Sequence, residues 1–289
     1  MIREALDKAV PGLIFLLVAG VAHGELTPIS EKEMGQVQGQ AMIAVDRTTG
    51  TTEQFTRFTL GMDAEIQTNI ETLALGDDGT QADVAVNQLS LGHISQDATS
   101  VQIDGKTYAA GDIVPFVGAD PYFELAEQNG EVAGFRFGLN RARGTLSGDI
   151  TSFSGDLGLQ LEDDTGTASQ ATLFDSTTTA TDYRATHVGL ADAATDCATG
   201  VNCAPLTNLK TLDVGVANPD GTVGFTEDFF LSFQKQAVEW TGVDGVVEAP
   251  AEAGVFFNLP TSMTLDLPTL QSGIPRARTE HIDRGLGLF

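Results

Sequence analysis

The stretch FTLGMDAEIQTNIET, residues 58–72, indicates the fold class of this 289-residue chain. Successive side chains of a β-strand point to opposite faces, so a period of two predicts one buried and one solvated face. A helix would instead scatter the carboxylates of the stretch around its circumference. We therefore expect a single strand of roughly thirteen residues, about 40 Å long. Its apolar and buried set is expected to be Phe58, Leu60, Met62, Ala64, Ile66 and Ile70.

Further stretches of the chain alternate in the same way, and the whole is predicted to be all-β. The turn Asn218-Pro219-Asp220-Gly221 lies between two of them. Its proline presets φ and its glycine accepts a left-handed conformation, so we expect a hairpin there. The alternating stretches are residues 82–91, 132–139, 144–161, 209–217, 222–234 and 262–267.

A short pattern that ends in glycine recurs at residues 70–76, 86–92 and 209–215. In each copy a three-residue step moves the apolar set from one strand face to the other, which a bulge or bend accomplishes. Repeated bends favour an elongated β-sandwich or a curved open sheet of long amphipathic strands. A β-solenoid is the alternative, although the third copy breaks the spacing of the first two.

The first 24 residues have the organisation of a secretory signal peptide. The apolar run LIFLLVAGVA leads to Ala22-His23-Gly24, which places small residues just before a cleavage site between Gly24 and Glu25. A membrane anchor is the alternative, but the run is shorter than the roughly 20 residues that span a bilayer. The leader predicts an exported protein of the periplasm, the outer-membrane surface or the extracellular space.

A short capped helix is predicted directly behind the leader. Ser30 and Glu33 have the spacing of a capping box, and Ile29 and Met34 have that of a hydrophobic staple. The expected organisation is a signal peptide (1–24), a helical leader segment (25–40), a single β-rich domain (41–274) and a basic C-terminal tail (275–289).

The region behind the leader resembles a known family. It reads Glu25-Leu26-x-Pro28, Ile29-Ser30, Glu33-Met34 and Val37-x-Gly39-Gln40-Ala41, followed by an expected strand. This order is similar to the start of uncharacterised secreted envelope proteins of Gram-negative gammaproteobacteria, some of which are named as pilus-system proteins of the Fil type. The resemblance covers residues 25–46. It implies an exported cell-envelope or surface protein and carries no catalytic residues.

The chain is strongly acidic, with a formal net charge of −25. Nucleic acid and anionic lipid surfaces are unfavourable partners, because both would repel it. The acidic turns at residues 162–166 and 77–79 offer oxygen ligands for calcium, but neither matches the twelve-residue calcium loop. We expect no cofactor, with calcium at these turns as the alternative.

Cys197 and Cys203 are the two cysteines of the chain and lie in the polar stretch DCATGVNCAP. In an exported chain, an even pair that closes a small loop predicts a disulfide. Cross-linking so short a loop stabilises the fold by roughly 2 kcal/mol. The pair lacks the C-x-x-C spacing of a redox site.

The motifs of common catalytic sites are absent from the sequence. It contains no G-x-S-x-G, no phosphate-binding G-x-x-x-x-G-K and no H-E-x-x-H. The histidines behind the leader, His93, His187 and His281, have no metal-binding spacing. We therefore expect a protein that is not an enzyme.

Two functions are compatible with these features. The first is a structural or adhesive cell-envelope protein, associated with a pilus or filament, whose partners are other envelope or filament proteins or further copies of itself. The alternative is a periplasmic or surface binding module for a glycan or an apolar ligand. Core packing also explains the aromatic residues that would line such a groove. These are Phe225, Phe229, Phe230, Phe233 and Trp240.

Overall fold

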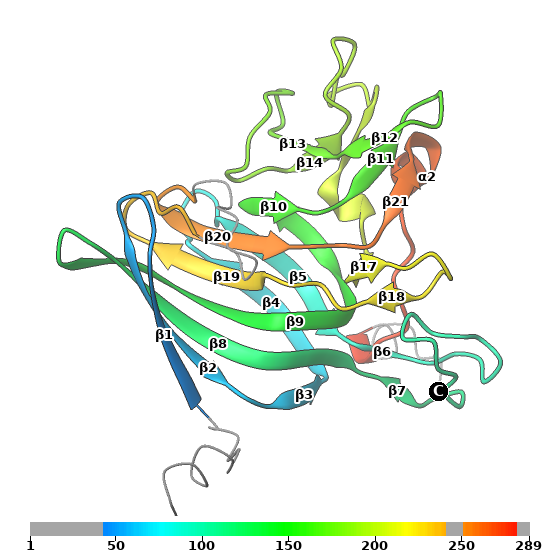
Figure 1. Cartoon of the computed structure of the whole chain (residues 1–289). Coiled ribbons are helices and arrows are strands. Elements are labelled where there is room, and N and C mark those ends of the chain that lie inside the picture. Colours follow the sequence, from blue (N-terminus) through cyan, green and yellow to red (C-terminus); the bar gives the residue numbers. More distant parts are fainter. Residues whose placement is uncertain (1–42, 241–250, 282–289) are drawn as a thin grey trace, which may run out of the picture. The chain divides into compact units, whose positions relative to one another are not determined.

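The computed structural model of the chain describes residues 43–240 and 251–281, all within one compact unit, residues 40–289. The leader, its cleavage site between Gly24 and Glu25, and the helix expected over residues 25–40 lie outside the described residues. The described part consists of strands and loops with two short helices, which confirms the all-β prediction (Figure 1). None of its helices is long and apolar enough to cross a membrane.

The largest sheet has eleven strands, ordered β1-β2-β8-β9-β19-β20-β10 along its main path, with β3, β4, β5 and β16 attached beside it. Its strands are β1 (Ile43–Thr49), β2 (Gln54–Leu60), β3 (Asp63–Ile66), β4 (Thr68–Leu75), β5 (Val84–Leu91), β8 (Phe116–Gln128), β9 (Glu131–Ser152), β10 (Gly155–Leu157), β16 (Thr211–Val214), β19 (Phe229–Gln234) and β20 (Gly254–Leu259).

The remaining elements form small sheets and single turns of helix beside the main sheet. They are β6 (His93–Ile94), β7 (Ile113–Val114), β11 (Gln160–Glu162), β12 (Ala168–Gln170), β13 (Thr172–Phe174), β14 (His187–Gly189), β15 (Cys203–Pro205), β17 (Val216–Ala217), β18 (Val223–Gly224), β21 (Thr264–Asp266), the 3-10 helix η1 (Leu206–Asn208) and the helix α2 (Leu267–Ser272).

The 22-residue strand β9 joins two parts of the main sheet. Its first half pairs with β8 and β19, and its second half pairs with β5 and β16. The change of partner falls at Gly144, whose φ is +151° and where an added Cβ would lie 2.7 Å from the Cα of Phe116. Long strands that curl or cross between two sheets were expected from the repeated bends. β8 and β9 are long and curved, and β9 also changes from one set of partners to the other (Figure 1).

The prediction of one strand over residues 58–72 was wrong, because the chain divides there into β2, β3 and β4. β2 and β3 both pair with β8, but a bulge separates them, at which Asp120 has a φ of 51° and donates its N–H to the carbonyl of Met62 at 2.8 Å. β4 turns away and pairs with β5. The alternation therefore predicted the extended backbone correctly and its continuity wrongly.

Two local predictions are confirmed. The bend expected at residues 86–92 is a register shift between Asn87 and Ser90, where Gln88 has a φ of 53°. The hairpin expected around residues 218–221 joins β17 to β18, and the N–H of Gly221 donates to the carbonyl of Asn218 at 3.0 Å.

The predicted disulfide between Cys197 and Cys203 is present, with a Cα–Cα distance of 5.0 Å. Both cysteines pack against Phe174 in a small buried cluster. The bridge closes a loop beside the short strands β13, β14 and β15, whose Leu173, Val188 and Ala204 are also buried.

Part of the predicted C-terminal tail lies against the sheet. The N–H of Ala277 donates to Oγ1 of Thr211 at 2.8 Å, and the carbonyl of Arg278 accepts from the N–H of Ile94 at 2.8 Å. Arg276 donates to the carbonyl of Gln88. Residues 282–289 lie outside the described residues.

Two apolar clusters pack on opposite faces of the main sheet. The main core lies between the second half of β9, β5, β16 and the smaller sheets, and includes Val84, Phe116, Leu146, Ile150, Leu212 and Leu259. The second core comprises Phe55, Tyr122, Ala126, Ala133, Phe230, Val238, Trp240, Ala251 and Phe256.

Candidate functional site

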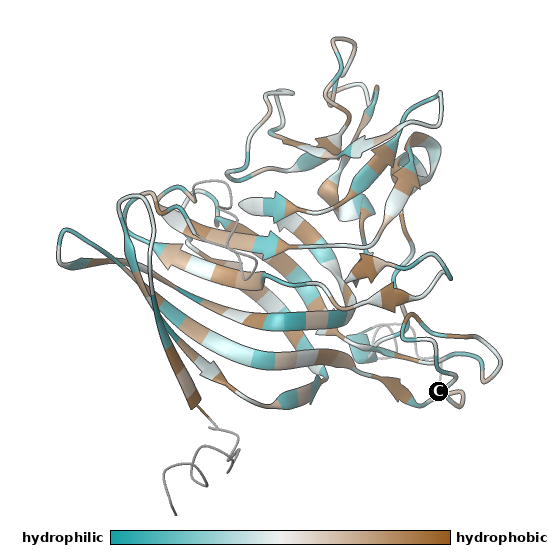
Figure 2. Ribbon diagram, viewed as in Figure 1, coloured by the Kyte–Doolittle hydropathy of each residue, from teal (hydrophilic) through white to brown (hydrophobic). Residues whose placement is uncertain are grey.

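The register of the main sheet sorts its side chains into two chemically different faces. Residues directly opposite each other on paired strands lie on the same face. Arg57, Glu124 and Arg136 are opposite one another on β2, β8 and β9. The neighbouring residues on the same three strands, Phe58, Phe123 and Phe137, are also opposite one another and lie on the other face. Polar and apolar bands alternate along these strands accordingly (Figure 2).

The aromatic position extends into a continuous line, which we call the apolar row. It crosses six strands, from β1 to β20, through five consecutive pairings. Neighbouring strands lie about 4.8 Å apart, so the row is about 24 Å long. No member carries a polar side-chain atom. The members are Val45, Phe58, Phe123, Phe137, Leu231 and Phe257.

One end of the apolar row belongs to the protein core and the other end faces solvent. Leu231 and Phe257 are partly buried and pack against the main core. Further out, Phe137 is 52% exposed, Phe58 38% and Val45 56%. The expectation that Phe58, Leu60 and Met62 are buried was therefore wrong, since all three are classed among the exposed large hydrophobic residues. Contiguous exposed apolar surface on a soluble protein indicates a ligand or partner site.

Ring contacts hold the aromatic members in place. Phe123 and Phe137 have ring centroids 5.0 Å apart, and Phe135 meets Phe137 edge-on at 5.5 Å. Phe135 in turn stacks on Phe233 at 5.0 Å. Aromatic pairs in these geometries stabilise one another beyond their area of contact. The exposed surface is therefore preorganised.

A pocket of about 470 Å³ adjoins the row where β9, β19 and β20 approach the β4–β5 turn. This volume is within the range of small-molecule sites. Phe135 and Phe233 form its aromatic wall, and Lys235 brings a charged group to its margin. Gln234 lines it through its backbone, since its buried side chain donates from Nε2 to the carbonyl of Glu252 at 2.7 Å. The remaining lining residues are Gly76, Val132, Ala133, Gly134, Gly254 and Val255.

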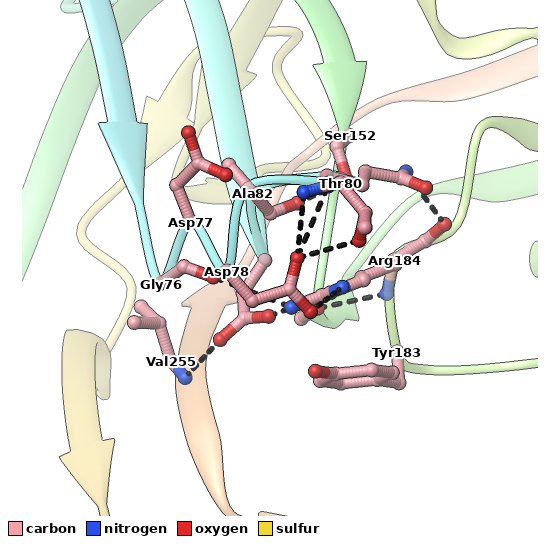
Figure 3. A network of polar contacts seen from close by, with 12 residues as sticks. Gly76, Asp77, Asp78, Thr80, Ala82, Ser152, Tyr183, Arg184 and Val255 are labelled. Atoms are coloured by element: carbon pink, nitrogen blue, oxygen red, sulfur yellow. Dashed lines mark hydrogen bonds and ion pairs between the residues drawn. The ribbon is translucent and has the colours of Figure 1, made fainter.

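A buried ion pair fixes the margin of this pocket (Figure 3). Asp83 is 2% exposed, accepts from Nε of Arg184 at 2.8 Å, and accepts the N–H of Val255 at 2.9 Å. Arg184 also donates from Nη2 to the carbonyl of Gly76 at 3.3 Å. An added Cβ at Gly76 or Gly254 would lie 2.1 Å or 2.6 Å from Asp83, so both glycines are needed for this close approach. The ion pair thus joins the β4–β5 turn to β20.

The same arginine holds the acidic turn that was considered for calcium. Asp78 accepts from Oγ1 and the N–H of Thr80, and from Nη1 of Arg184 at 2.8 Å. The hydroxyl of Thr80 and the guanidinium of Arg184 lower the pKa of Asp78, and the paired carboxylate raises the pKa of Arg184. The second acidic turn is closed similarly, since Asp163 accepts from Thr165 and Thr167.

Calcium is therefore expected to leave the thermal stability unchanged. The carboxylates of both turns already accept internal hydrogen bonds, and residues 43–240 and 251–281 contain no group of three or more metal-ligating side chains. Thermal melts in millimolar calcium and in chelator should give the same Tm. A rise of several degrees with calcium would contradict this assignment.

The turn aspartates predict a loss of stability in acid. Hydrogen bonds from Thr side chains and backbone N–H groups lower the pKa of Asp163, Asp175 and Asp220. A folded-state pKa below the unfolded value of about 3.9 gives stabilisation that is complete above that pH and lost as pH falls through the folded-state pKa. Melts between pH 6 and pH 2.5 should show Tm falling below about pH 4.

The matched variant for this prediction is Asp163→Asn, which keeps an acceptor oxygen without the titrating charge. Its Tm should fall less steeply in acid than that of the wild type. An identical acid dependence in the two proteins would show that this turn does not contribute.

The face opposite the apolar row is closed by a buried charged cluster. Glu124 accepts from Nε of Arg57 at 3.0 Å and from Nε of Arg136 at 2.5 Å, and Arg136 is fully buried. The Arg136 guanidinium lies 5.0 Å from the ring of Trp240 and 5.4 Å from that of Tyr122.

Titration behaviour in this cluster follows from burial and from Glu124. Burial raises the pKa of Tyr122 to about 12. Burial also lowers the pKa of Arg57, but hydrogen bonding to Glu124 and its negative charge outweigh this effect, and the net shift is upward. Arg57 is therefore charged at neutral pH, and the cluster stabilises the sheet from the face opposite the apolar row.

The aromatic residues singled out in the sequence do not form one groove. Phe229 and Phe233 lie on the same face as the apolar row, half-buried. Phe230 and Trp240 are buried in the second core on the opposite face. Phe225 packs beneath the guanidinium of Arg143, with its ring centroid 4.5 Å away. Phe58, Phe123 and Phe137 were not among the expected groove residues. Their signal in the sequence is strand alternation, which does not specify which strands pair or in what register.

The histidines are dispersed over different elements. His93 lies in β6 and contacts Oγ1 of Thr145 and Oε1 of Gln102, and His187 lies in β14 beside Thr186. Burial lowers the pKa of His187. Local hydrogen bonds explain the positions of His93 and His187.

Comparisons of the chain with protein-family models, with curated proteins and with solved structures found no match, so the function has to be inferred from the arrangement of its own residues.

Proposed function

We propose that this protein is a non-enzymatic binding module that holds an acyl chain, attached to an uncharged or zwitterionic head group, along the apolar row. The observation that carries the proposal is the alignment of six apolar side chains across six strands, three of which, Phe137, Phe58 and Val45, are exposed. Covering this surface would remove exposed aromatic and aliphatic groups from water, which favours binding by roughly 25 cal/mol per Å².

The chemistry of the row favours an acyl chain over a glycan. A sugar brings many hydroxyl groups, and covering them without hydrogen-bond partners costs free energy. The six side chains of the row have no donor or acceptor to offer. The part of the row outside the core, from Val45 to Phe137, spans three strand spacings, about 14 Å. This is close to the roughly 15 Å that one leaflet of acyl chains occupies in a bilayer, so one chain can lie along it.

The charge of the protein selects the head group. A net charge of −25 repels carboxylate and phosphate monoester heads at low ionic strength. Lys235, beside the adjoining pocket, already lies 3.4 Å from Glu131. A neutral or zwitterionic head avoids this repulsion.

Titration with a fluorescent acyl probe tests the proposal. A probe with a zwitterionic phosphocholine head is expected to bind saturably at one site, and an anionic probe of the same chain length should bind more weakly at low salt, with the difference shrinking as salt is added. Organic extraction of the purified protein, followed by mass spectrometry, gives a second readout. Absence of saturable binding, or equal binding of the two probes at low salt, would contradict the proposal.

Export to the cell envelope is part of the same proposal and is supported by the leader sequence and by the resemblance of residues 25–46. A structural or assembly role is the second candidate function. The observation that favours it is strand β1, all of whose residues are exposed.

A further inference from the structure

We propose that β1 pairs in antiparallel fashion with β1 of a second copy of this chain, forming a two-fold symmetric dimer with one continuous sheet. Within the described residues, β1 pairs with β2 alone, at the end of the main path of the sheet. All seven of its residues, Ile43–Thr49, are exposed. An edge strand offers unpaired N–H and C=O groups to another strand.

The composition of β1 gives its edge little protection. Natural edge strands are blunted by charged side chains, above all lysine, and by proline, bulges or very short length. Asp46 and Arg47 are the charged residues of β1, and their opposite charges cancel. β1 reads IAVDRTT, contains neither lysine nor proline, and pairs with β2 through all seven positions without a bulge. Ile43, Val45, Thr48 and Thr49 are β-branched, which suits them to a strand. A second strand can therefore add to this edge without rearrangement.

The apolar row defines the register of the pair. A two-fold axis perpendicular to the sheet keeps the same face of both copies on the same side. With Val45 opposite the partner's Val45, the two rows meet end to end. Ile43 then lies opposite the partner's Arg47, and Ala44 opposite the partner's Asp46. Such a contact uses the same patch on both copies, so the assembly is complete with two copies and does not extend into a fibre.

A second copy fits the charge of this edge. The two charged residues of β1, Asp46 and Arg47, cancel, and Arg57 on the neighbouring strand is paired with Glu124. The edge is therefore locally neutral. The overall charge of −25 per copy opposes association at long range, and this repulsion is screened beyond roughly 8 Å at physiological salt. Dimerisation is expected to strengthen as ionic strength rises.

A cysteine cross-link tests the contact. Both native cysteines are joined in a disulfide, so Val45→Cys introduces the one free thiol. Opposed residues in an antiparallel pair have Cα atoms roughly 4.5–5.5 Å apart, within disulfide range. Mild oxidation should give a covalent dimer of Val45→Cys. The control Val101→Cys, at a position 66% exposed and remote from β1 in the sequence, should give no covalent dimer. Equal dimer yields would overturn the proposal.

A pair of opposite charge changes at Ala44 tests the register. In the proposed dimer each copy of residue 44 faces Asp46 of the partner subunit. Ala44→Asp should weaken dimerisation about fivefold and Ala44→Lys should strengthen it about fivefold, because each change acts at two symmetric contacts. Sedimentation equilibrium at moderate salt measures both. A monomeric wild type at every salt concentration, or an unchanged affinity in both variants, would contradict the proposal.

The same variants separate this proposal from the proposed function. Ala44 lies on the face opposite the apolar row and is not part of the binding surface. Probe binding by Ala44→Asp that persists at concentrations where this variant is monomeric would leave the acyl-binding proposal intact whether or not the dimer forms.

Discussion

Replacing Glu124 with leucine is expected to lower the free energy of unfolding by about 3–5 kcal/mol. Glu124 is 3% exposed and accepts hydrogen bonds from both Arg57 and Arg136. Its removal takes away the carboxylate to which Nε of the fully buried Arg136 donates, and removing one partner of a buried ion pair is strongly destabilising. Equilibrium unfolding in urea, monitored by fluorescence of Trp240, which packs against Arg136, gives the change directly.

Two further variants control this experiment. Glu124→Gln retains one acceptor oxygen and the volume of the side chain, and should cost less than Glu124→Leu. The double variant Glu124→Leu/Arg136→Met removes the charge together with its carboxylate, and should recover part of the loss. A double variant that is less stable than Glu124→Leu would contradict the assigned coupling.

Replacing Phe137 with aspartate is expected to weaken acyl-probe binding at least tenfold, which corresponds to about 1.4 kcal/mol. Phe137 lies in the middle of the apolar row and contacts the rings of Phe123 and Phe135. A carboxylate there would have to be desolvated when an acyl chain covers it. Fluorescence titration with the zwitterionic probe measures the effect.

The matched control is Val101→Asp, which adds the same charge at an exposed apolar residue outside the row. It should bind the probe as the wild type does, and Phe137→Leu should lie within a fewfold of the wild type. Because Phe137 is 52% exposed, the fold should survive its replacement. If Phe137→Asp and Val101→Asp lose binding equally, the added negative charge explains the loss and the apolar row does not.

Local chemistry in the sequence was sufficient to predict strands, turns and the disulfide. Alternation at residues 58–72 indicated extended backbone, and the Pro219-Asp220-Gly221 run indicated the turn between β17 and β18. These features depend on neighbouring residues in the chain. The break between β2 and β3 was missed because it depends on a bulge at Asp120, which is distant in sequence.

Burial could not be predicted from alternation alone. A period of two says that two faces differ, but which face is covered depends on what packs against it. Phe58 was expected inside and is exposed, because the other face of β2 carries Phe55 into the second core. The apolar row itself is a product of register between five pairs of strands, and single-sequence patterns do not specify register between distant strands.

The ion pair at the pocket margin shows the same limit. Asp83 and Arg184 lie 101 positions apart in the chain. Asp83 sits within an alternating stretch and Arg184 within a polar loop, so neither has a local signature of its partner. In so acidic a chain, the sequence does not indicate which carboxylate forms a buried ion pair, because that depends on which cation the fold places beside it.

Photo-crosslinking with a diazirine-labelled acyl probe that carries a zwitterionic head tests the central claim most directly. If the apolar row holds the acyl chain, peptide mapping by mass spectrometry should locate the label on β2, β8 and β9, at or beside Phe58, Phe123 and Phe137. Labelling that spreads over unrelated exposed apolar residues such as Val101 and Val216, or that unlabelled probe does not compete away, would contradict it.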